Sequence, residues 1–295
     1  ALNWRYQSAP QARLDGRRIG YPRGKGLGGS ALINGMVYFR GHRRDYDDWA
    51  TAGARGWSYR DVLPYFRRSE HNENFPDSPY HGRGGPMNVR TVTHPNRLNR
   101  AFFDALASLG VPPNADLNGA DSTGSALRQL QIRDGIRDTT ARAMLRPALG
   151  RPNLTVLTQA HGTRVLLTEH RATGLEVLTP EGLLTIACRG EIVLSAGALQ
   201  SPQLLMLSGI GDAAELAQAG VMPRHALSGV GRNLHDHLAS PVHMATKVPD
   251  SYGVSWRAMP RNLWQIAQYA LSRTGPLANN IFEAAAFVKT REGLD

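Results

Sequence analysis

A glycine-rich run from Gly24 to Ser30 is the part of the sequence whose residue types point most directly to ligand chemistry. Glycines lack a Cβ, so backbone N–H groups can approach phosphate oxygens closely and form an anion-binding concavity. Ser30 adds a hydroxyl donor, and Arg23 and Lys25 add positive charge. Taken alone, the run is more simply interpreted as a tight glycine turn without any ligand, and binding of a phosphate-bearing ligand is the alternative; the longer motif described below favours the ligand.

The run fits the dinucleotide-binding spacing G-x-G-x-x-G at Gly24, Gly26 and Gly29, but its surroundings do not. That pattern follows a buried strand and opens a helix. Here the preceding residues are RRIGYPR, with two adjacent arginines and a proline. A P-loop would need Gly-Lys-Ser/Thr after the glycines, and no such triplet follows. We therefore do not interpret the run as the first turn of a Rossmann unit or as a P-loop.

Other residues of catalytic type have simpler interpretations. His235, Asp236, His237 and His243 include the His-x-His spacing of metal ligands. We interpret them as histidines oriented by a carboxylate in a structural loop, and we predict no metal. Ser208 stands in Ser-Gly-Ile-Gly, which is not the G-x-S-x-G turn of a nucleophilic serine. A single cysteine excludes an internal disulfide framework.

Composition places the chain among globular proteins. Hydrophobic residues make up 41% and charged residues 20% of its 295 residues. No stretch approaches the roughly 18 apolar residues of a transmembrane segment, so none is expected. The net charge is 34 − 24 = +10 and comes almost entirely from arginine. Because these arginines are scattered and no aromatic stacking platform lies among them, we expect no nucleic-acid partner.

The elements that must position these residues fall into two patterns. Before residue 150 the sequence predicts a helix over 59–70 with Ser58 as its N-cap, a short strand over 86–90 and an amphipathic helix over 97–109. After residue 153 a period of two predicts an antiparallel meander. A more continuously apolar run, 191–198, predicts a buried strand, and Ser201 and Pro202 then open a helix that Gly209 ends. The expected meander strands are 154–160, 164–170, 172–179 and 183–188.

Two long motifs in register resemble the signatures of the glucose–methanol–choline oxidoreductases, a family related to choline dehydrogenase. The first is the run YPRGKGLGGSALINGMVYFRG from Tyr21 to Gly41, followed by DYDDWA. The second is GALQSPQLLMLSGIG from Gly197 to Gly211. Two further runs, RDGIRDTTARAMLRPALGRPNLTV and VGRNLHDHL, occur in the family's order. The resemblance covers nearly the whole chain.

The resemblance implies an FAD cofactor and places it on this sequence residue by residue. Gly28, Gly29 and Ser30 would lie at the pyrophosphate and Asn34 to Val37 along the flavin; the family's common second serine is Ala31 here. A family valine that contacts adenine corresponds to Gly162, and the turn at Ser195 would approach the adenosine half. The full set of predicted cofactor-binding residues is Arg23, Gly26, Leu27, Gly28, Gly29, Ser30, Asn34, Gly35, Met36, Val37, Gly162, Ser195, Ala196 and Gly197.

The resemblance also implies a mixed α/β fold, present here in part, in which an FAD-binding domain is interleaved with an antiparallel-sheet substrate domain. Residues 1–75 and 120–237 would belong to the FAD-binding domain, and residues 76–119 and 238–295 to the substrate domain. The family's first strand–glycine–helix unit would precede Ala1. Its catalytic histidine, with a His or Asn partner, would follow Asp295, so the catalytic residues are unknown and the remainder of the chain is an expected partner.

The function implied is oxidation of a primary alcohol by hydride transfer to flavin N5, with an unknown electron acceptor. We expect the chain alone to retain FAD weakly and to show no turnover, and we expect a cytoplasmic or peripheral membrane location. Two alternatives stay open. One is a hydroxynitrile-lyase-like or non-catalytic member of the same fold, and the other is a basic binding module without flavin chemistry.

Overall fold

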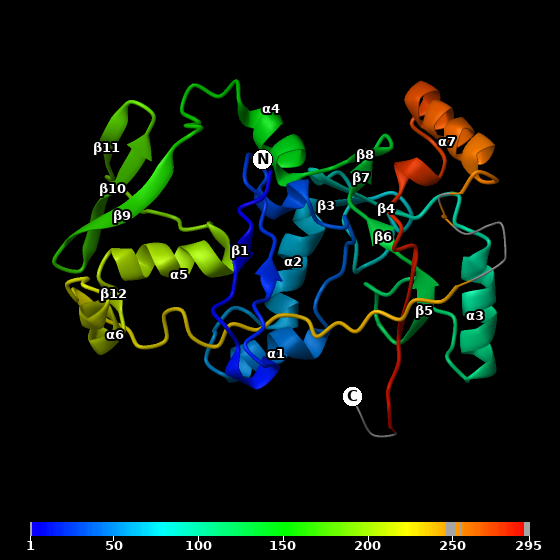
Figure 1. The fold of residues 1–295 in the computed structure, drawn as a ribbon, viewed down its shortest axis with the longest axis horizontal. Helices are drawn as coiled ribbons and strands as arrows, with labels where there is room; N and C mark the ends of the chain where they lie inside the picture. The colour runs from blue at the N-terminus through cyan, green and yellow to red at the C-terminus, as the bar shows by residue number, and fades with distance from the viewer. Residues whose placement is uncertain (1, 246–251, 254, 292–295) are drawn as a thin grey trace. The chain divides into compact units, whose positions relative to one another are not determined.

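The computed structural model describes residues 2–245, 252–253 and 255–291. It divides into two compact units, one made of residues 1–154 and 245–295 and the other of residues 155–244. Each is described by itself (Figure 1). Helices and small sheets alternate in both, which confirms a mixed α/β fold. The assignment of segments to an FAD-binding and a substrate domain stays a prediction.

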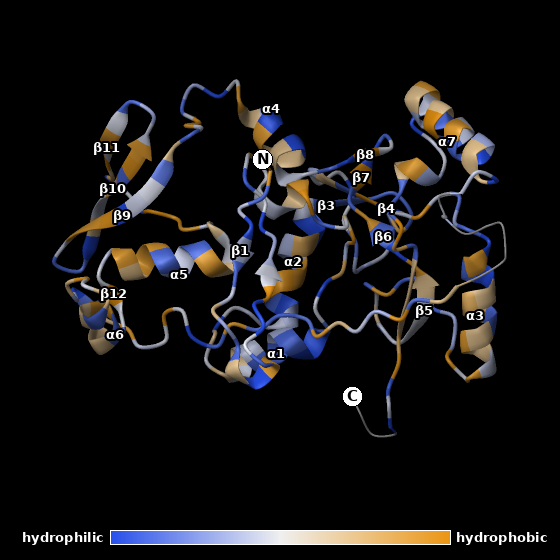
Figure 2. Ribbon diagram, in the orientation of Figure 1, coloured by the Kyte–Doolittle hydropathy of each residue, from blue (hydrophilic) through white to orange (hydrophobic). Residues whose placement is uncertain are grey.

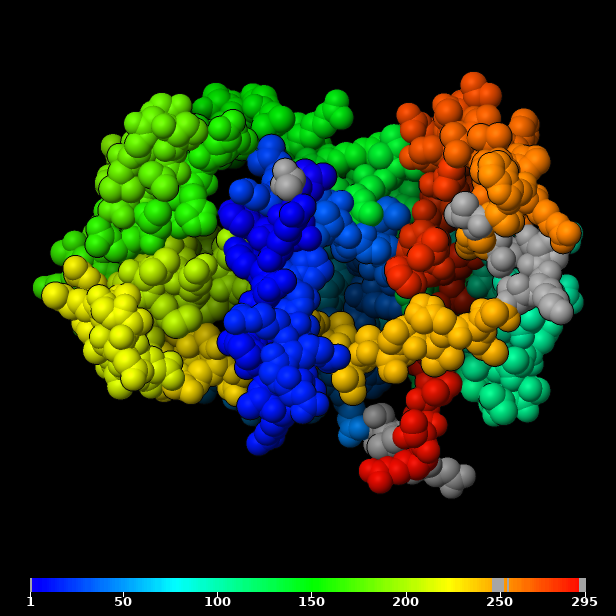
Figure 3. Space-filling model, viewed as in Figure 1, coloured from blue at the N-terminus to red at the C-terminus, as the bar shows by residue number. Residues whose placement is uncertain are grey.

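The first unit begins with an irregular segment that leads into the glycine run. Strand β1 (Tyr6–Gln7) pairs antiparallel with β2 (Gly20–Tyr21), and the 3-10 turn η1 (Ala12–Leu14) lies between them. The glycine run then enters a second 3-10 turn, η2 (Gly29–Leu32). In the space-filling view this segment, in deep blue, lies on the face turned to the viewer (Figure 3).

A small sheet of order β3-β4-β6 lies at the centre of the first unit. Strand β3 (Glu70–Asn72) runs parallel to β4 (Met87–Thr91), which pairs antiparallel with β6 (Gln129–Leu130). Helices α1 (Arg43–Thr51) and α2 (Tyr59–Ser69) precede the sheet. The hairpin of β7 (Ile132–Arg133) and β8 (Ile136–Arg137) follows it, and a π-helical turn, η3 (Ala141–Leu145), continues into α4 (Arg146–Ala148).

The rest of the first unit joins segments that are far apart in sequence. Strand β5 (Gly124–Leu127) pairs antiparallel with β14 (Ala284–Phe287). Helix α3 (Leu98–Ser108) packs near β5, while α7 (Met259–Ser272) and the 3-10 turn η4 (Pro276–Ala278) precede β14. Hydrophobic residues, orange in Figure 2, occur along both α3 and α7. The largest apolar cluster of the unit contains Val92, Leu130 and Ile132, with Met36 and Val37 packed against it.

The second unit consists of a three-stranded antiparallel meander followed by two helices and a short pair of strands. Strands β9 (His161–Thr168), β10 (Arg171–Thr179) and β11 (Gly182–Ala187) form an antiparallel sheet of order β11-β10-β9. Helix α5 (Gly197–Leu207) contacts β9. Strand β12 (Ile210–Gly211) pairs in parallel with β13 (His225–Ala226), and α6 (Ala213–Gln218) lies between them in sequence.

Most of the predicted elements are confirmed. Helix α2 begins after Ser58, whose Oγ accepts a hydrogen bond from the Asp61 N–H, and β4 and α3 lie within one residue of their predicted bounds. Three of the four predicted meander strands are present. The predicted helix end at Gly209 is also correct, and Gly209 has a φ of +83°.

Three predictions for the second unit were wrong. Residues 154–160 and 191–198 are not paired strands, because neither has a neighbouring strand among the described residues; Val193 is 74% exposed. Helix α5 begins at Gly197 rather than at Ser201, and Pro202 lies inside it. Pro202 is the sixth residue of α5 and has no N–H to donate to the Ala198 carbonyl, so the helix lacks one intrahelical hydrogen bond at this point.

Candidate functional site

The glycine run forms a closed turn. The Gly24 N–H donates to the Ser30 Oγ at 3.1 Å, and the Gly29 N–H donates to the Gly26 carbonyl at 3.0 Å. Gly26 and Gly28 have φ angles of +144° and +100°, a region that favours glycine. A Cβ on Gly24 would lie 2.0 Å from the Gly29 carbonyl oxygen, so the turn closes only because Gly24 has no side chain.

This turn presents consecutive amides to solvent. Among the described residues, the N–H groups of Gly26, Leu27 and Gly28 have no hydrogen-bond acceptor. Gly26 and Leu27 are exposed. Successive outward N–H groups in a turn with positive φ angles are the usual form of a backbone anion site. The Ser30 Oγ accepts from Gly24, which leaves its own hydrogen available to a ligand oxygen.

The turn rests on the start of the π-helical segment. A Cβ on Gly28 would lie 3.3 Å from the Ala141 Cβ, and the Thr140 Oγ1 donates to the Gly28 carbonyl at 3.4 Å. A cavity of about 490 Å³ opens beside these residues and is lined on its other side by Met144, Arg151 and their neighbours. The run RDTTARAML therefore supports the glycine turn, a role that the sequence reasoning did not assign to it.

The predicted flavin segment, Asn34–Val37, is held by Arg137. The Arg137 guanidinium donates to the carbonyls of Ala31 and Asn34 at 3.2 and 2.6 Å, and to the Asn34 Oδ1 at 2.8 Å. Burial lowers the pKa of Arg137. Met36 has a φ of +60°, and its N–H donates to the Asn34 Oδ1 at 3.0 Å. Arg137 thus fixes a bend that the local sequence does not favour.

The same segment is also joined to the central sheet. The Gln131 N–H donates to the Met36 carbonyl at 2.7 Å, and Val37 forms a bridge with Leu130. The Gly35 carbonyl accepts from the Asn280 side chain, and a Cβ on Gly35 would lie 3.4 Å from the Phe282 ring. The exposed Asn34 and Gly35 therefore have a fixed backbone between two anchored ends.

The two basic side chains of the run differ in position. The Lys25 Nζ lies 4.4 Å from the centre of the Trp4 ring, a cation–π contact. The Arg23 guanidinium lies 5.8 Å from the Tyr21 ring and donates to the Pro22 carbonyl. Both cations lie on residues adjacent to the amide turn in sequence, and aromatic rings restrict their movement.

The remaining predicted cofactor residues belong to the second unit. Gly162 lies in β9, where a Cβ would meet Leu175 and Leu204 at ordinary contact distances of 3.8 Å. Ser195, Ala196 and Gly197 form the exposed start of α5, where the Ala196 N–H donates to the Ser201 Oγ at 3.0 Å. The predicted cofactor residues of the first unit lie together in one continuous region. Their position relative to the four predicted residues of the second unit is not defined.

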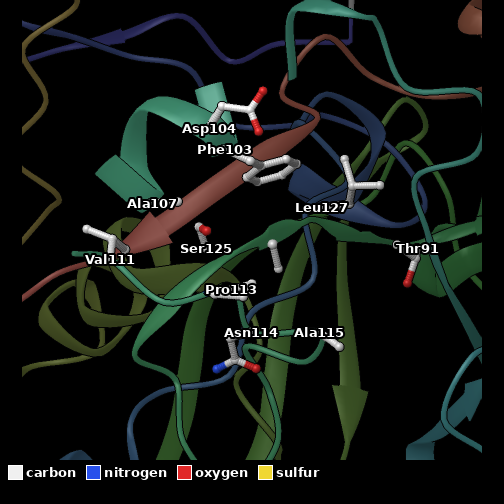
Figure 4. Close-up of a pocket in the computed structure, with 11 residues that line it drawn as sticks. Thr91, Phe103, Asp104, Ala107, Val111, Pro113, Asn114, Ala115, Ser125 and Leu127 are labelled. Carbon is white, nitrogen blue, oxygen red and sulfur yellow. The ribbon is translucent and has the colours of Figure 1, made fainter. Parts of the chain in front are cut away.

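Three other features of the described residues were candidates for a reactive site. His235, Asp236 and His237 are exposed in an extended stretch, and the described residues contain no cluster of metal-ligating side chains. Ser208 is buried, accepts from the Val165 N–H at 2.8 Å and donates to the Leu204 carbonyl. An apolar pocket of about 510 Å³ between α3 and β5, into which Phe103 and Leu127 project, contains none of the predicted site residues (Figure 4).

Comparison with known families decides the relationship. The family model described as GMC oxidoreductase matches residues 7–239. The chain belongs to this family. It is 40% identical over 291 residues to an alcohol dehydrogenase [acceptor] from Pseudomonas putida, covering 98% of this chain and 53% of the relative. It is also 40% identical to an oxygen-dependent choline dehydrogenase from Photobacterium profundum, covering 99% of this chain and 51% of the relative.

Solved structures of GMC proteins resemble it as well. The pyridoxine 4-oxidase from Mesorbium loti is 38% identical, with a TM-score of 0.73 over 77% of this chain and 45% of the other. An FAD-dependent oxidoreductase from Chaetomium thermophilum is 28% identical, with a TM-score of 0.85 over 96% of this chain and 52% of the other. The chain spans about half the length of these relatives. GMC oxidoreductases are FAD-dependent, so FAD is the cofactor of this chain's family.

Proposed function

We propose that this chain forms the cofactor-facing part of an FAD-dependent oxidoreductase that acts on the CH–OH group of primary alcohols. The observation that carries the proposal is the amide turn of Gly26, Leu27 and Gly28, joined by a short 3-10 turn to an anchored Asn34–Val37 segment. The diphosphate of FAD needs closely spaced hydrogen-bond donors, and the flavin ring beside it needs a backbone segment that is held in a fixed position. The residues present fit both requirements.

The residues of the first unit would contact two parts of the cofactor, the diphosphate and the flavin. The three turn amides and the Ser30 hydroxyl would donate to the diphosphate oxygens, and Arg23 and Lys25 would add favourable charge at short range. Asn34, Gly35, Met36 and Val37 would lie along the flavin. Bound FAD supplies a hydride acceptor at flavin N5.

The second unit would supply the remaining contacts. Gly162 and the turn Ser195–Gly197 would lie near the adenosine half of the cofactor, where small residues permit close approach. Gly162 would contribute backbone only, since it has no side chain to pack against adenine.

The substrate class is inferred from the names of the relatives rather than from a pocket. Relatives named as choline and alcohol dehydrogenases support a primary alcohol of the choline type. We assign no electron acceptor and no catalytic base to this chain. No helix among the described residues is long and apolar enough to cross a membrane. A cytoplasmic or peripheral membrane location is part of the proposal.

The test measures cofactor and turnover separately in the gene product that contains this sequence. Flavin fluorescence quenching gives the FAD dissociation constant, and dye reduction with a panel of primary alcohols, choline included, gives turnover. We expect saturable FAD binding and alcohol-dependent dye reduction. FAD binding with cyanohydrin cleavage and no dye reduction would instead favour the lyase alternative. Strongly salt-dependent DNA binding without FAD binding would favour a basic binding module.

A further inference from the structure

A buried cluster of charged and polar side chains lies beyond the predicted flavin segment in the first unit. His81, Glu70 and Asn72 are each at most 1% exposed, and Gln129 is 4% exposed. The His81 Nδ1 lies 2.8 Å from the Glu70 Oε1, and its Nε2 lies 2.9 Å from the Asp116 Oδ2. The cofactor proposal uses none of these groups, and the sequence reasoning did not single them out.

The geometry around His81 favours a doubly protonated ring, because each ring nitrogen faces a carboxylate oxygen. A neutral imidazole has one N–H, so one of its nitrogens would face a carboxylate with a lone pair. The Asn72 Nδ2 lies 3.0 Å from the His81 Nδ1, but also 2.8 Å from the Glu70 Oε1 and 3.1 Å from the Gln129 Oε1, so its two hydrogens serve three acceptors. A hydrogen from Asn72 would still leave the His81 Nδ1 and the Glu70 Oε1 2.8 Å apart with no proton between them. Both carboxylate contacts are satisfied when His81 donates from both nitrogens as an imidazolium.

The charges of the cluster balance only in that state. Arg40 forms an ion pair with Glu70, and both side chains are almost completely buried. Arg40 and protonated His81 then offset Glu70 and Asp116. Arg67 of α2 also reaches His81, because its Nε donates to the His81 carbonyl at 3.1 Å, but the Arg67 residue is exposed and is not part of the buried charge balance. Burial opposes the charged ring, but hydrogen bonds with Asp116 and Glu70 outweigh it and raise the pKa of His81.

Two of the cluster's residues hold the backbone that follows the flavin segment. Asp116 accepts from the Asn118 N–H at 3.1 Å and from the Gln129 Nε2 at 2.8 Å. Asn118 in turn accepts from the Arg40 N–H at 2.9 Å and donates to the Tyr38 carbonyl at 3.0 Å. The Tyr38 N–H donates to the Gln129 carbonyl at 2.9 Å. Residues 38–40 are thus fixed on both sides by groups that Asp116 orients.

We propose that the His81 imidazolium is a positioning residue for the cofactor site. It holds Asp116 and Glu70 so that residues 38–40, and through them Asn34–Val37, keep the geometry that the flavin contacts. Loss of its proton leaves a net negative charge in the buried cluster and releases this segment. The inference deepens the proposed function and rests on it for the role of Asn34–Val37.

The raised pKa of His81 determines how its contribution to stability changes with pH. A group whose pKa is raised on folding stabilises the fold fully below its unfolded value, about 6.5 for histidine. That contribution is lost as the pH rises through the folded-state pKa. The segment 36–40 should therefore stay ordered below about pH 6.5 and loosen as the pH rises through the raised pKa of His81.

The first readout does not depend on FAD. Amide hydrogen exchange of residues 36–40 is followed from about pH 6 to 9 in the FAD-free gene product that contains this sequence, corrected for intrinsic rates and referenced to α3. We expect wild-type protection to fall on the alkaline side by about tenfold or more, as for one partner lost from a buried charged hydrogen bond. His81→Gln should show low protection without that pH dependence. Protection in wild type that is independent of pH would overturn the inference.

Two further variants sharpen the comparison. His71→Gln is the matched control, because His71 lies on β3 between Glu70 and Asn72 but its Nδ1 accepts from the Gly84 N–H instead of facing carboxylates. It should behave as wild type. Asp116→Asn keeps the shape but removes one negative charge, so the loss of protection should begin at lower pH. This variant decides the test if His81→Gln does not fold, and an unchanged pH profile in it contradicts the inference.

FAD affinity is the second readout and separates the two proposals. His81→Gln should raise the FAD dissociation constant about tenfold near pH 6, below the ordinary histidine pKa of about 6.5, and His71→Gln should not. Failure of the wild-type protein to bind FAD contradicts the proposed function, while the exchange data still decide the role of His81. Normal FAD binding in both variants, with unchanged exchange, contradicts only the role of His81.

Discussion

Replacing Gly24 by alanine tests whether the closed glycine turn is the cofactor site. The new Cβ would lie 2.0 Å from the Gly29 carbonyl oxygen and 2.8 Å from the Ser30 Cα. Ordinary contact between such heavy atoms is about 3.5–4.0 Å, so the turn must open by more than about 1 Å. Both atoms belong to the backbone, so a side-chain rotation cannot relieve the overlap.

The expected magnitude follows from that overlap. Forcing a methyl group into a filled space costs typically about 1–3 kcal/mol. If the turn opens to relieve the strain, FAD binding must close it again, and the dissociation constant rises by about 10- to 100-fold. Opening also separates the Gly24 N–H from the Ser30 Oγ, which removes the orientation of that hydroxyl.

The assay compares Gly24→Ala with Gly20→Ala in the gene product that contains this sequence. A Cβ on Gly20, four residues earlier in β2, meets nothing within 4 Å. Thermal unfolding and FAD titration by flavin fluorescence are measured for both variants. Gly20→Ala should resemble wild type in both. Equal FAD affinities in the two variants would refute the assignment of this turn to the cofactor, whatever their stabilities.

Three further predictions concern other positions. Arg137→Gln removes the donors to the Ala31 and Asn34 carbonyls, so amide hydrogen exchange of residues 31–36 should become faster and the FAD dissociation constant should rise about tenfold. Arg137→Lys should recover part of this loss. Unchanged exchange in Arg137→Gln would contradict the anchoring role. Ser208→Ala leaves the buried Val165 N–H without its acceptor, so local opening in residues 155–244 should become easier by about 1–3 kcal/mol without any change in α3 exchange. Gly162→Val places a Cβ at ordinary contact distance in strand β9, so the variant should fold normally and bind FAD at least as tightly as the wild-type protein. Weaker FAD binding by this variant would argue against the adenine contact.

Local patterns in the sequence predicted much of the fold. The Ser58 cap, the alternation along 164–188 and the glycine at 209 are each decided by neighbours in sequence, so they could be read directly. The failures at 154–160 and 191–198 have a common cause. An apolar extended run becomes a strand only when another strand supplies its hydrogen bonds, and a one-dimensional pattern does not contain that partner.

The candidate site divides in the same way. The residue types of Gly24–Ser30 by themselves determined a tight turn and predicted that it binds an anion, because glycines adopt its positive φ angles without strain. The anchoring of Asn34 by Arg137 and the enclosure of His81 by Glu70 and Asp116 join residues 11 to 103 positions apart. Such contacts depend on how strands and loops return to one place in space. The sequence by itself predicted a phosphate-binding loop at Gly24–Ser30, and the tertiary structure decided what holds this loop and its neighbouring segment in place.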